Sequence, residues 1–186
     1  MCGIVGFVNQ KNQKEATIEA MMERIIHRGP TSSGKYVDEQ IALGFRRLSI
    51  IDLEGGSQPI YNQDRNKVII FNGEIYNYQT LRTELETLGY LFETKTDTEV
   101  ILHGYEAWGV DVLQKLRGMF AFAIWDIDKQ ELVGARYHFG MKPKYYAEMN
   151  DTFMFGSEIK SFLAHPDFDK TLNKAALKPY LTFQYS

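Results

Sequence analysis

The sequence predicts an α+β fold in which antiparallel sheets form layers with helices, and two observations carry this prediction. Short apolar runs joined by short turns recur along the chain, whereas the helical patterns stand in separate blocks, which is the order expected for antiparallel sheets with segregated helices. The chain has 186 residues, of which 44% are hydrophobic and 24% charged. That length and composition suit one soluble globular domain with a sizeable core.

The first half of the chain is expected to begin with a buried strand over residues 3–8, because "GIVGFV" is a short apolar run with β-branched residues. A helix is expected over residues 13–29, where apolar side chains recur at helical spacing before a Gly-Pro stop. Strands are expected next at residues 34–38, 41–46 and 67–72.

Two further helices are expected in the middle of the chain. Residues 77–90 form the first, with Asn77 as its N-cap and a glycine as its stop. Residues 96–109 form the second, where Thr96 and Glu99 stand three positions apart before an apolar stripe. This spacing predicts a capping box.

The rest of the chain predicts mainly strands. A turn over residues 126–130 joins the first two of them as a hairpin, and residues 157–186 suggest short helices that end without a natural stop. We therefore expect the chain, residues 1–186, to be a fragment of a longer protein. The four strands are expected at residues 118–126, 131–136, 144–148 and 152–156.

Charge and cysteine content exclude several classes of protein. A formal net charge of -3 provides no basic field for nucleic acid or an acidic membrane surface. The longest near-continuous apolar run, residues 119–125, is far shorter than the roughly 20 residues that span a bilayer, and the N-terminus does not resemble a signal peptide. A single cysteine excludes an internal disulfide framework and cysteine-rich zinc sites. We expect a soluble protein of the cytoplasm.

That single cysteine, Cys2, directly follows Met1. Loss of Met1 would leave Cys2 with its thiol and a free α-amine on adjacent carbons. In model peptides thiols and α-amines both titrate within about two units of neutrality, so the amine can accept the thiol proton directly or through one water. One residue would then supply both nucleophile and base. The alternative is that a cysteine stands here by chance.

Other polar residues are candidates for binding a substrate. Asn72 and Gly73 come where a strand gives way to a helix, and an amide with an approachable backbone N–H can bind an oxyanion; the alternative is a common Asn-Gly turn. Arg46 or Arg47 can bind a carboxylate through a bidentate fork, or simply end a strand in solvent. Asp97 can hold an ammonium group or cap a helix. "HRGP" is either a helix exit or a loop near an active site.

The combination of motifs resembles a known family. "MCGIVGF", "HRGP", "RLSIID", "QPIYN", "NGEIYN", "TDTEV", "GMFAFAIWD" and "FGMKP" follow one another over roughly residues 1–165. In this order they resemble class II, or N-terminal nucleophile, glutamine amidotransferases. The similarity is strongest to the N-terminal glutaminase domain of glutamine-hydrolysing asparagine synthetase. The resemblance implies two stacked antiparallel sheets between helix layers, an αββα arrangement.

The resemblance also implies a reaction. Cys2, exposed by loss of Met1, would attack the side-chain amide of glutamine, with its own α-amine as base and then as acid toward ammonia. Asn72 and Gly73 would form the oxyanion hole. Water would resolve the γ-glutamyl thioester to glutamate.

Substrate binding is implied by the same resemblance. Arg47 would hold the α-carboxylate of glutamine, and Asp97 and Glu74 match positions near its α-ammonium group. The strand that lines the pocket would be Leu48, Ser49, Ile50 and Ile51.

Cofactors and partners are implied mainly for the rest of a longer protein. The resemblance implies no cofactor and no metal in this domain; ATP and Mg²⁺ would belong to a C-terminal synthetase domain, which would be the partner of this one and would use the ammonia to make asparagine from aspartate. A homodimer is also consistent with the family. Three departures from the family pattern, Thr31, Tyr137 and Lys144, lie outside the catalytic residues and concern local packing or the contact with that domain.

Two alternatives to this interpretation remain. The chain can be the glutaminase domain of a different amidotransferase, one that makes a sugar or nucleotide amine. It can also be a non-catalytic domain of the same fold. The joint presence of Cys2, Arg47, Asn72, Gly73 and Asp97 favours an enzyme.

Overall fold

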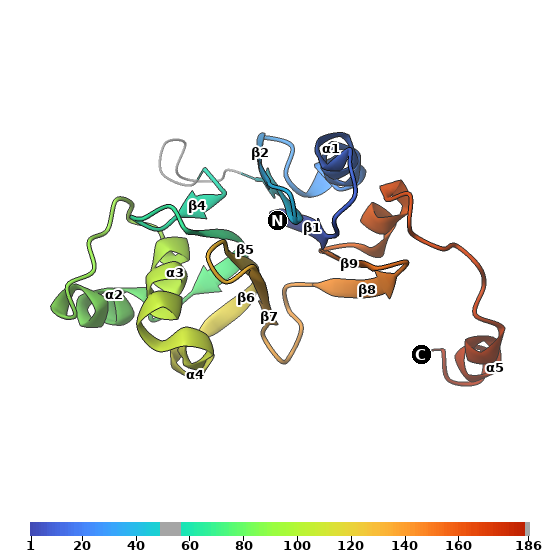
Figure 1. Ribbon diagram of the computed structural model, residues 1–186. Coiled ribbons are helices and arrows are strands. Elements are labelled where there is room, and N and C mark those ends of the chain that lie inside the picture. The colour runs from blue at the N-terminus through green and yellow to red at the C-terminus, as the bar shows by residue number, and fades with distance from the viewer. Residues whose placement is uncertain (49–56, 185–186) are drawn as a thin grey trace.

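Two antiparallel sheets lie face to face in the computed structural model of the chain, which describes residues 1–48 and 57–184 (Figure 1). The sheet that we call sheet A has the strand order β2-β3-β1-β9-β8, and sheet B has the order β4-β5-β6-β7. Sheet A consists of β1 (Gly3–Val8), β2 (Ser32–Val37), β3 (Ile41–Arg47), β8 (Tyr145–Met149) and β9 (Thr152–Gly156). Sheet B consists of β4 (Ile60–Tyr61), β5 (Lys67–Ile75), β6 (Gly118–Asp126) and β7 (Glu131–Arg136).

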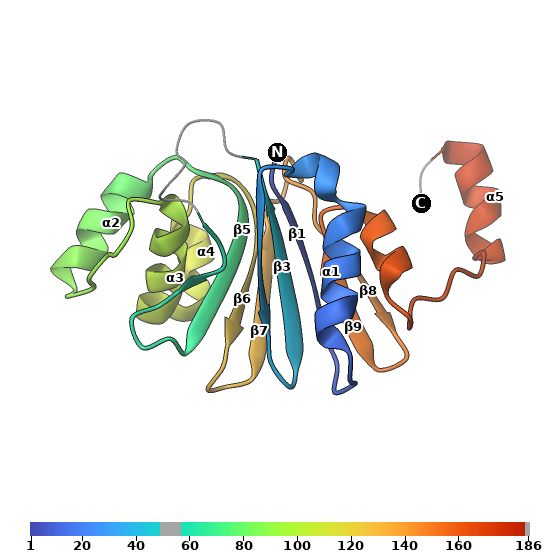
Figure 2. The ribbon, with the colours of Figure 1, turned by 90° about the horizontal axis from the view of Figure 1, so that it is seen from above.

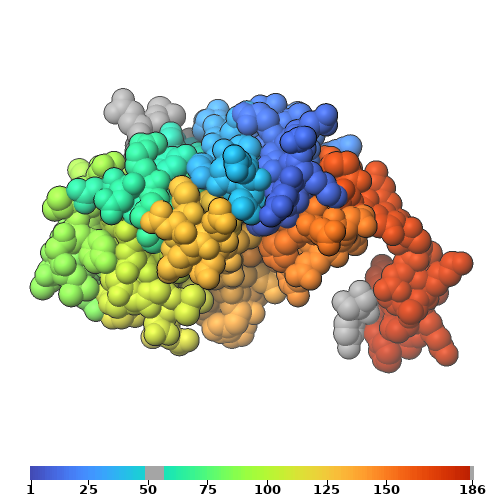
Figure 3. Space-filling model, viewed as in Figure 1, coloured from blue at the N-terminus to red at the C-terminus, as the bar shows by residue number. Residues whose placement is uncertain are grey.

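Helices cover the outer face of each sheet (Figure 2). Helix α1 and the 3₁₀ helix η3 pack on sheet A, and the helices between β5 and β6 pack on sheet B. The helical elements are α1 (Lys14–Arg24), η1 (Ile26–Arg28), α2 (Tyr78–Thr87), α3 (Asp97–Trp108), η2 (Gly109–Asp111), α4 (Val112–Lys115), η3 (Ile159–Ala164) and α5 (Lys174–Phe183). Helix α5 buries no residue and stands apart from the body at the end of an extended segment (Figure 3). None of the helices within the described ranges is long and apolar enough to cross a membrane.

Three apolar layers hold this arrangement together. One lies between α1, η3 and sheet A, one between the two sheets, and one between sheet B and helices α2 and α3. The middle layer contains fully buried side chains from both sheets, among them Ile4, Phe45, Ile70 and Trp125. The αββα fold that the resemblance implies is therefore confirmed.

Two contacts at one end of the sandwich align the sheets. The indole Nε1 of Trp125 on β6 donates to Asp38 Oδ2, 2.8 Å away, at the turn between β2 and β3. Beside it the rings of Tyr36 and Tyr61 meet edge to face at 6.1 Å. Because the turn end of β3 is fixed against the Trp125 end of β6, the opposite end of β3, at Arg47, lies toward the far end of β5.

The predicted elements are confirmed with shifted boundaries. The first helix ends at Arg24, not near Gly29, because the chain tightens into η1, where the N–H of Arg28 bonds the Ile25 carbonyl at 3.0 Å. The short elements β4 and α4 were not predicted, since two and four residues carry too little periodicity to be recognised.

The predicted N-cap at Asn77 is wrong in its contacts. Asn77 does precede α2, but its side chain makes no capping bond to that helix. Its Nδ2 donates to the Lys115 carbonyl and its Oδ1 accepts from the Arg117 N–H, both at 2.9 Å. The turn before β6 offers the amide one acceptor and one donor together, and this tertiary pair replaces the cap.

Candidate active site

Cys2 and Arg47 come directly after the last paired residues at one end of sheet A. Strand β1 pairs with β3 as far as Gly3 opposite Arg46, and continuing this antiparallel register by one step sets Cys2 against Arg47. Side chains alternate along a strand: Phe45 lies in the layer between the sheets, whereas Arg46 turns to α1, where it bonds Glu23 at 2.8 Å. Arg47 therefore projects toward the inter-sheet side, as does Cys2, which packs against that layer.

Asn72 projects from sheet B into the same layer. On β5, Val68 and Ile70 lie between the sheets and Ile69 and Phe71 face the helices, so alternation turns Asn72 inward. Its side chain is buried, and its Nδ2 has no hydrogen-bond partner within residues 1–48 and 57–184. A buried donor without a partner costs about 1–3 kcal/mol. An acceptor supplied by a ligand would remove that cost.

The chain brings these residues of the two sheets to the same level. Gly34 on β2 lies opposite Phe45 of β3, and a Cβ at Gly34 would collide with the carbonyl of Gln58. The side chain of Gln58 in turn bonds the backbone of Phe71 on β5. Phe45 and Phe71 are thus at one height in the sandwich. Continuing past them, β3 leads to Arg47 and β5 leads to Asn72.

The backbone N–H of Gly73 points to the open edge of β5. Along this strand the N–H groups of Phe71 and Ile75 face away from β6, because they donate to Gln58 Oε1 at 2.6 Å and to Asp97 Oδ2 at 2.8 Å. Gly73 lies midway between them, and hydrogen-bonding direction repeats every second residue. A Cβ at Gly73 would collide with the backbone of β6 at Met119. The Gly73 N–H therefore lies on this edge between two N–H groups that side chains accept, those of Phe71 and Ile75.

Asp97, the first residue of α3, completes this edge. Its carboxylate accepts the Ile75 N–H, and burial raises the pKa of Asp97 to about 6, with the charge of Glu74 adding to the effect and the backbone hydrogen bond opposing it. This half-buried carboxylate has no cation partner among the residues that the structure describes, which suits it to an ammonium group.

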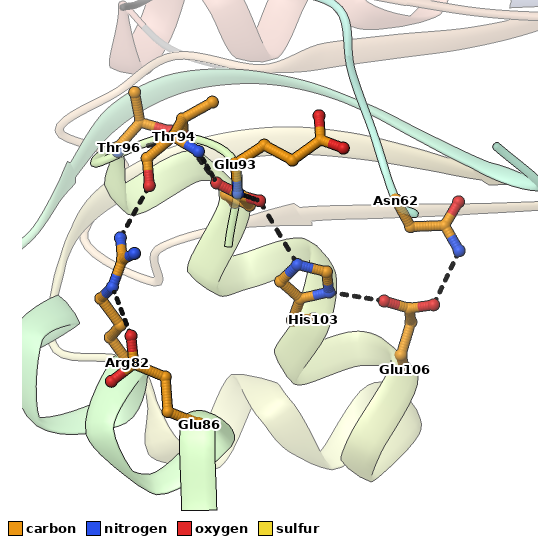
Figure 4. Close-up of polar contacts among 9 residues, drawn as sticks. Asn62, Arg82, Glu86, Glu93, Thr94, Thr96, His103 and Glu106 are labelled. Carbon is orange, nitrogen blue, oxygen red and sulfur yellow. Dashed lines mark hydrogen bonds and ion pairs between the residues drawn. The ribbon is translucent and has the colours of Figure 1, made fainter. Parts of the chain in front are cut away.

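A buried polar network holds the loop that leads to Asp97 (Figure 4). The carboxylate of Glu99 accepts the N–H groups of Glu93 and Thr94 at 2.8 and 2.7 Å. His103, one turn further along α3, lies 3.4 Å from Glu99 and bonds Glu106 at 2.7 Å. Burial opposes the charge on His103, but the two carboxylates outweigh it and raise the pKa of His103 to about 9.

The predicted capping box at Thr96 and Glu99 is also wrong, because both side chains bond other partners. Thr96 precedes α3, yet its side chain makes no capping bond, and its hydroxyl instead lies 2.8 Å from that of Thr94. The side chain of Glu99 extends back past Thr96 to accept the N–H groups of Glu93 and Thr94. The ion pair with His103 helps to hold the Glu99 carboxylate beside the N–H groups of Glu93 and Thr94, and not beside the N–H of Thr96.

We expect His103→Ala to lower the free energy of unfolding by about 3 kcal/mol, because it strands two carboxylates that are largely buried. The folded pKa of His103 lies above its ordinary value of about 6.5. The charged histidine thus stabilises the fold fully below pH 6.5, and this stabilisation is lost as the pH rises through 9. Denaturant unfolding at pH 6 and pH 10 measures this, and an equal difference between wild type and variant at both pH values would contradict it.

The "HRGP" motif covers the end of η1 and the two residues after it, and it lies beside Cys2 and Arg47. Arg28 donates from Nε to the Cys2 carbonyl at 3.1 Å and pairs through Nη1 with Glu158, also at 3.1 Å. Pro30 bridges to Arg47, whose carbonyl accepts the N–H of Thr31 at 3.1 Å. The motif therefore holds the Cys2 end of β1 and the Arg47 end of β3 together.

The remaining predicted site residues fall into three groups. Leu48 follows β3 directly and is half-buried, and Glu74 is exposed on the same face of β5 as Asn72. Ser49, Ile50 and Ile51 lie outside the described residues. Arg46, the second candidate for the carboxylate clamp, is committed to α1 through Glu23 and the Met22 carbonyl.

Two departures from the family pattern are accommodated near β7. The ring of Tyr137 packs on Phe120 at 5.8 Å between centroids. The Nζ of Lys144 lies 5.2 Å from the centre of the Phe155 ring, and burial, with the charge of Arg136, lowers the pKa of Lys144 to about 8. Neither side chain intrudes on Cys2, Asn72 or Asp97 through any contact among the described residues.

Comparison with known proteins identifies the family. The family described as "Glutamine amidotransferase domain" matches residues 1–186, and the chain belongs to this family. Asparagine synthetase [glutamine-hydrolyzing] 1 of Bacillus subtilis is 48% identical over 190 residues, which is 100% of this chain and 30% of that protein. Asparagine synthetase B [glutamine-hydrolyzing] of Escherichia coli is 40% identical over 168 residues, 88% of this chain and 30% of that protein. The chain thus spans less than a third of the length of these relatives.

A solved structure shares the fold. The glutamine phosphoribosylpyrophosphate amidotransferase of B. subtilis superimposes with a TM-score of 0.72 at 22% identity, over 88% of this chain and 43% of that one. A structure titled as the allosteric regulatory enzyme of purine biosynthesis gives a TM-score of 0.75 at 23% identity, with the same coverage of 88% and 43%. At these identities the similarity concerns the fold alone.

Proposed function

We propose that this domain hydrolyses the side-chain amide of glutamine to glutamate and ammonia, with Cys2 as nucleophile. One observation supports this most strongly: facing sheets direct Cys2, Arg47 and Asn72 into one layer at the same end of the sandwich, beside the Gly73 N–H and Asp97. An amino-acid amide needs a nucleophile, an oxyanion site, and one clamp of each charge, and these five residues supply that set.

The chemistry follows from the N-terminal position of Cys2. After Met1 is removed, the α-amine takes the thiol proton and the sulfur bonds to the amide carbon. The resulting oxyanion accepts hydrogen bonds from Asn72 Nδ2 and the Gly73 N–H, which are held in place before the reaction. The amine returns the proton as ammonia leaves, and water then cleaves the thioester to glutamate.

The acceptor of the ammonia lies beyond this chain. The names of the relatives and their greater length support a larger protein that uses the ammonia to make asparagine from aspartate, with ATP and Mg²⁺ bound outside this domain. This domain itself would need no cofactor or metal, since the thiol and amine supply the reactive groups. We place the reaction in the cytoplasm, because a reactive single thiol persists in a reducing compartment. Pairing as a homodimer belongs to the same proposal.

Removal of the carboxylate clamp tests the proposal. We expect Arg47→Ala to raise the glutamine KM by at least about 30-fold, since loss of a buried charge contact costs about 2–5 kcal/mol. Arg47→Lys should restore binding only in part, because a point charge cannot form the bidentate fork. Steady-state ammonia release measures both variants, and Arg46→Ala serves as the matched control with an unchanged KM. Unaltered glutamine kinetics in Arg47→Ala would contradict the assignment.

The pKa of Asp97 predicts how glutamine binding depends on pH. This pKa is raised to about 6, so Asp97 carries its charge above pH 6 and loses it below. We therefore expect the glutamine Kd of the catalytically inactive Cys2→Ala protein to rise about tenfold per unit as the pH falls below 6. Calorimetric titration measures this, and Asp97→Asn should bind weakly with no dependence on pH in this range. A Kd that stays constant from pH 7 to pH 5 would exclude Asp97 as the ammonium site.

A further inference from the structure

Gln58 makes an unusual pair of contacts at the edge of β5. Strand β4 pairs with β5 only at Ile60 opposite Ile69 and at Tyr61 opposite Val68. Beyond that point no strand of residues 1–48 or 57–184 pairs with Phe71 on this edge, and the side-chain amide of Gln58 takes the place of a strand. Its Oε1 accepts the Phe71 N–H at 2.6 Å and its Nε2 donates to the Phe71 carbonyl at 3.1 Å. The side chain thus copies the two hydrogen bonds of an antiparallel strand residue.

The backbone of Gln58 is fixed against the other sheet. Its carbonyl approaches β2 so closely at Gly34 that no Cβ fits between them. Gly34 lies opposite Phe45 on β3. Through one residue, sheet A is therefore tied to sheet B at the level just before the proposed clamp Arg47 and the proposed oxyanion donor Asn72.

Strand β5 does not need Gln58 in order to exist. Its other edge pairs with β6 along the whole length of the strand, from Lys67 opposite Asp126 to Ile75 opposite Gly118. What the Gln58 amide determines is the position of the free edge at Phe71, immediately before Asn72 and Gly73. Catalytic groups must be held to within about 0.5 Å of their productive positions, so a small shift of this edge would misalign both oxyanion donors.

We propose that Gln58 is a positioning residue, which holds β5 so that Asn72 Nδ2 and the Gly73 N–H meet the oxyanion formed from the substrate. This inference rests on the proposed function. It predicts that Gln58 acts on the transition state and not on substrate binding, because Arg47 and Asp97 would still hold the α-carboxylate and α-ammonium groups.

The isosteric variant Gln58→Glu tests this proposal. A carboxylate can still accept the Phe71 N–H, but it sets an acceptor against the Phe71 carbonyl and so breaks half of the pair. We expect kcat for glutamine to fall by about 10–100-fold, less than the loss of an oxyanion donor itself, with KM within about twofold of wild type. Gln58→Ala should lose at least as much. Gln114→Glu, the same change at an exposed residue, is the matched control.

An aldehyde analogue of glutamine provides a second readout. The Cys2 sulfur bonds to the aldehyde carbon of glutamate γ-aldehyde, and the C=O double bond becomes a C–O single bond. The thiol proton moves either to this oxygen or to the α-amine of Cys2; in the second case the oxygen stays an oxyanion in the same site. Its inhibition constant should rise in Gln58→Glu by the factor by which kcat falls. A purely structural role would not produce this match. All assays are run well below the lowest melting temperature of the variants.

The outcomes separate the two proposals. Wild-type protein with a free Cys2 that releases no ammonia would overturn the proposed function. Active wild type with an unchanged kcat in a folded Gln58→Glu, or with a loss that falls on KM alone, would overturn the positioning role and leave the function intact. Failure of both Gln58 variants to fold would also overturn it, because Gln58 would then be needed for the fold itself.

Discussion

Cys2→Ala is expected to abolish glutamine hydrolysis while the fold is retained. The chain holds no other thiol that could replace the nucleophile. Cys2 is half-buried and lies at the edge of the inter-sheet layer, so loss of one sulfur atom should change the free energy of unfolding by only about 1 kcal/mol or less. Ammonia release and thermal unfolding measure the two effects.

Glutamine binding provides the control for this variant. Since Arg47 and Asp97 remain, Cys2→Ala should bind glutamine with a Kd near the KM of the wild type. Cys2→Ser, which keeps a weaker nucleophile, should retain at most a small residual rate. Ammonia release above background by the alanine variant would refute the nucleophile assignment.

The second large effect concerns the α-amine of Cys2. A retained Met1, or one residue added before Cys2, converts this amine into an amide nitrogen with no basic lone pair. The thiol would then lose its base, and the added residue would crowd the space that the substrate amide must occupy. We expect the extended protein to bind glutamine weakly and to hydrolyse none of it.

A cleavable extension gives the matched control for the amine. Trimming the same preparation to a free Cys2 should restore activity, with a pH profile limb near the ordinary range of an α-amine. Full activity in a protein that intact mass shows to retain Met1 would exclude the amine as base. A water held by neighbouring polar groups would then have to accept the thiol proton.

Periodicity in the sequence was enough to predict most of this fold. Strand β1 and the hairpin of β6 and β7 are predicted correctly because period-two or continuous apolar runs are local signals. The caps at Asn77 and Thr96 are wrong because the side chains found tertiary partners, which no local spacing reveals. Sequence patterns predict where a helix begins, but not which hydrogen bonds the side chain at that position makes.

The sequence predicts which residues belong to the candidate site better than it predicts how they are arranged in space. Cys2, Arg47, Asn72 and Asp97 come from motif order, and strand alternation then explains why three of them face one layer. Gln58 was not singled out, although "QPIYN" was among the motifs, because its role depends on the backbone of Phe71, thirteen positions away. A glutamine before a short strand carries no sequence signal for such a contact.

The central claim, that Cys2 with a free α-amine is the nucleophile toward a glutamine side chain, is tested most directly by intact mass spectrometry. The protein is incubated with a diazoketone analogue of glutamine, whose carbon alkylates the attacking thiol with loss of N₂. We predict one adduct per chain, located on the N-terminal peptide at Cys2, in protein that has lost Met1, and protection by excess glutamine. Protein that retains Met1, and Cys2→Ala, should stay unlabelled. An adduct on any other residue, or equal labelling with and without Met1, would contradict the account.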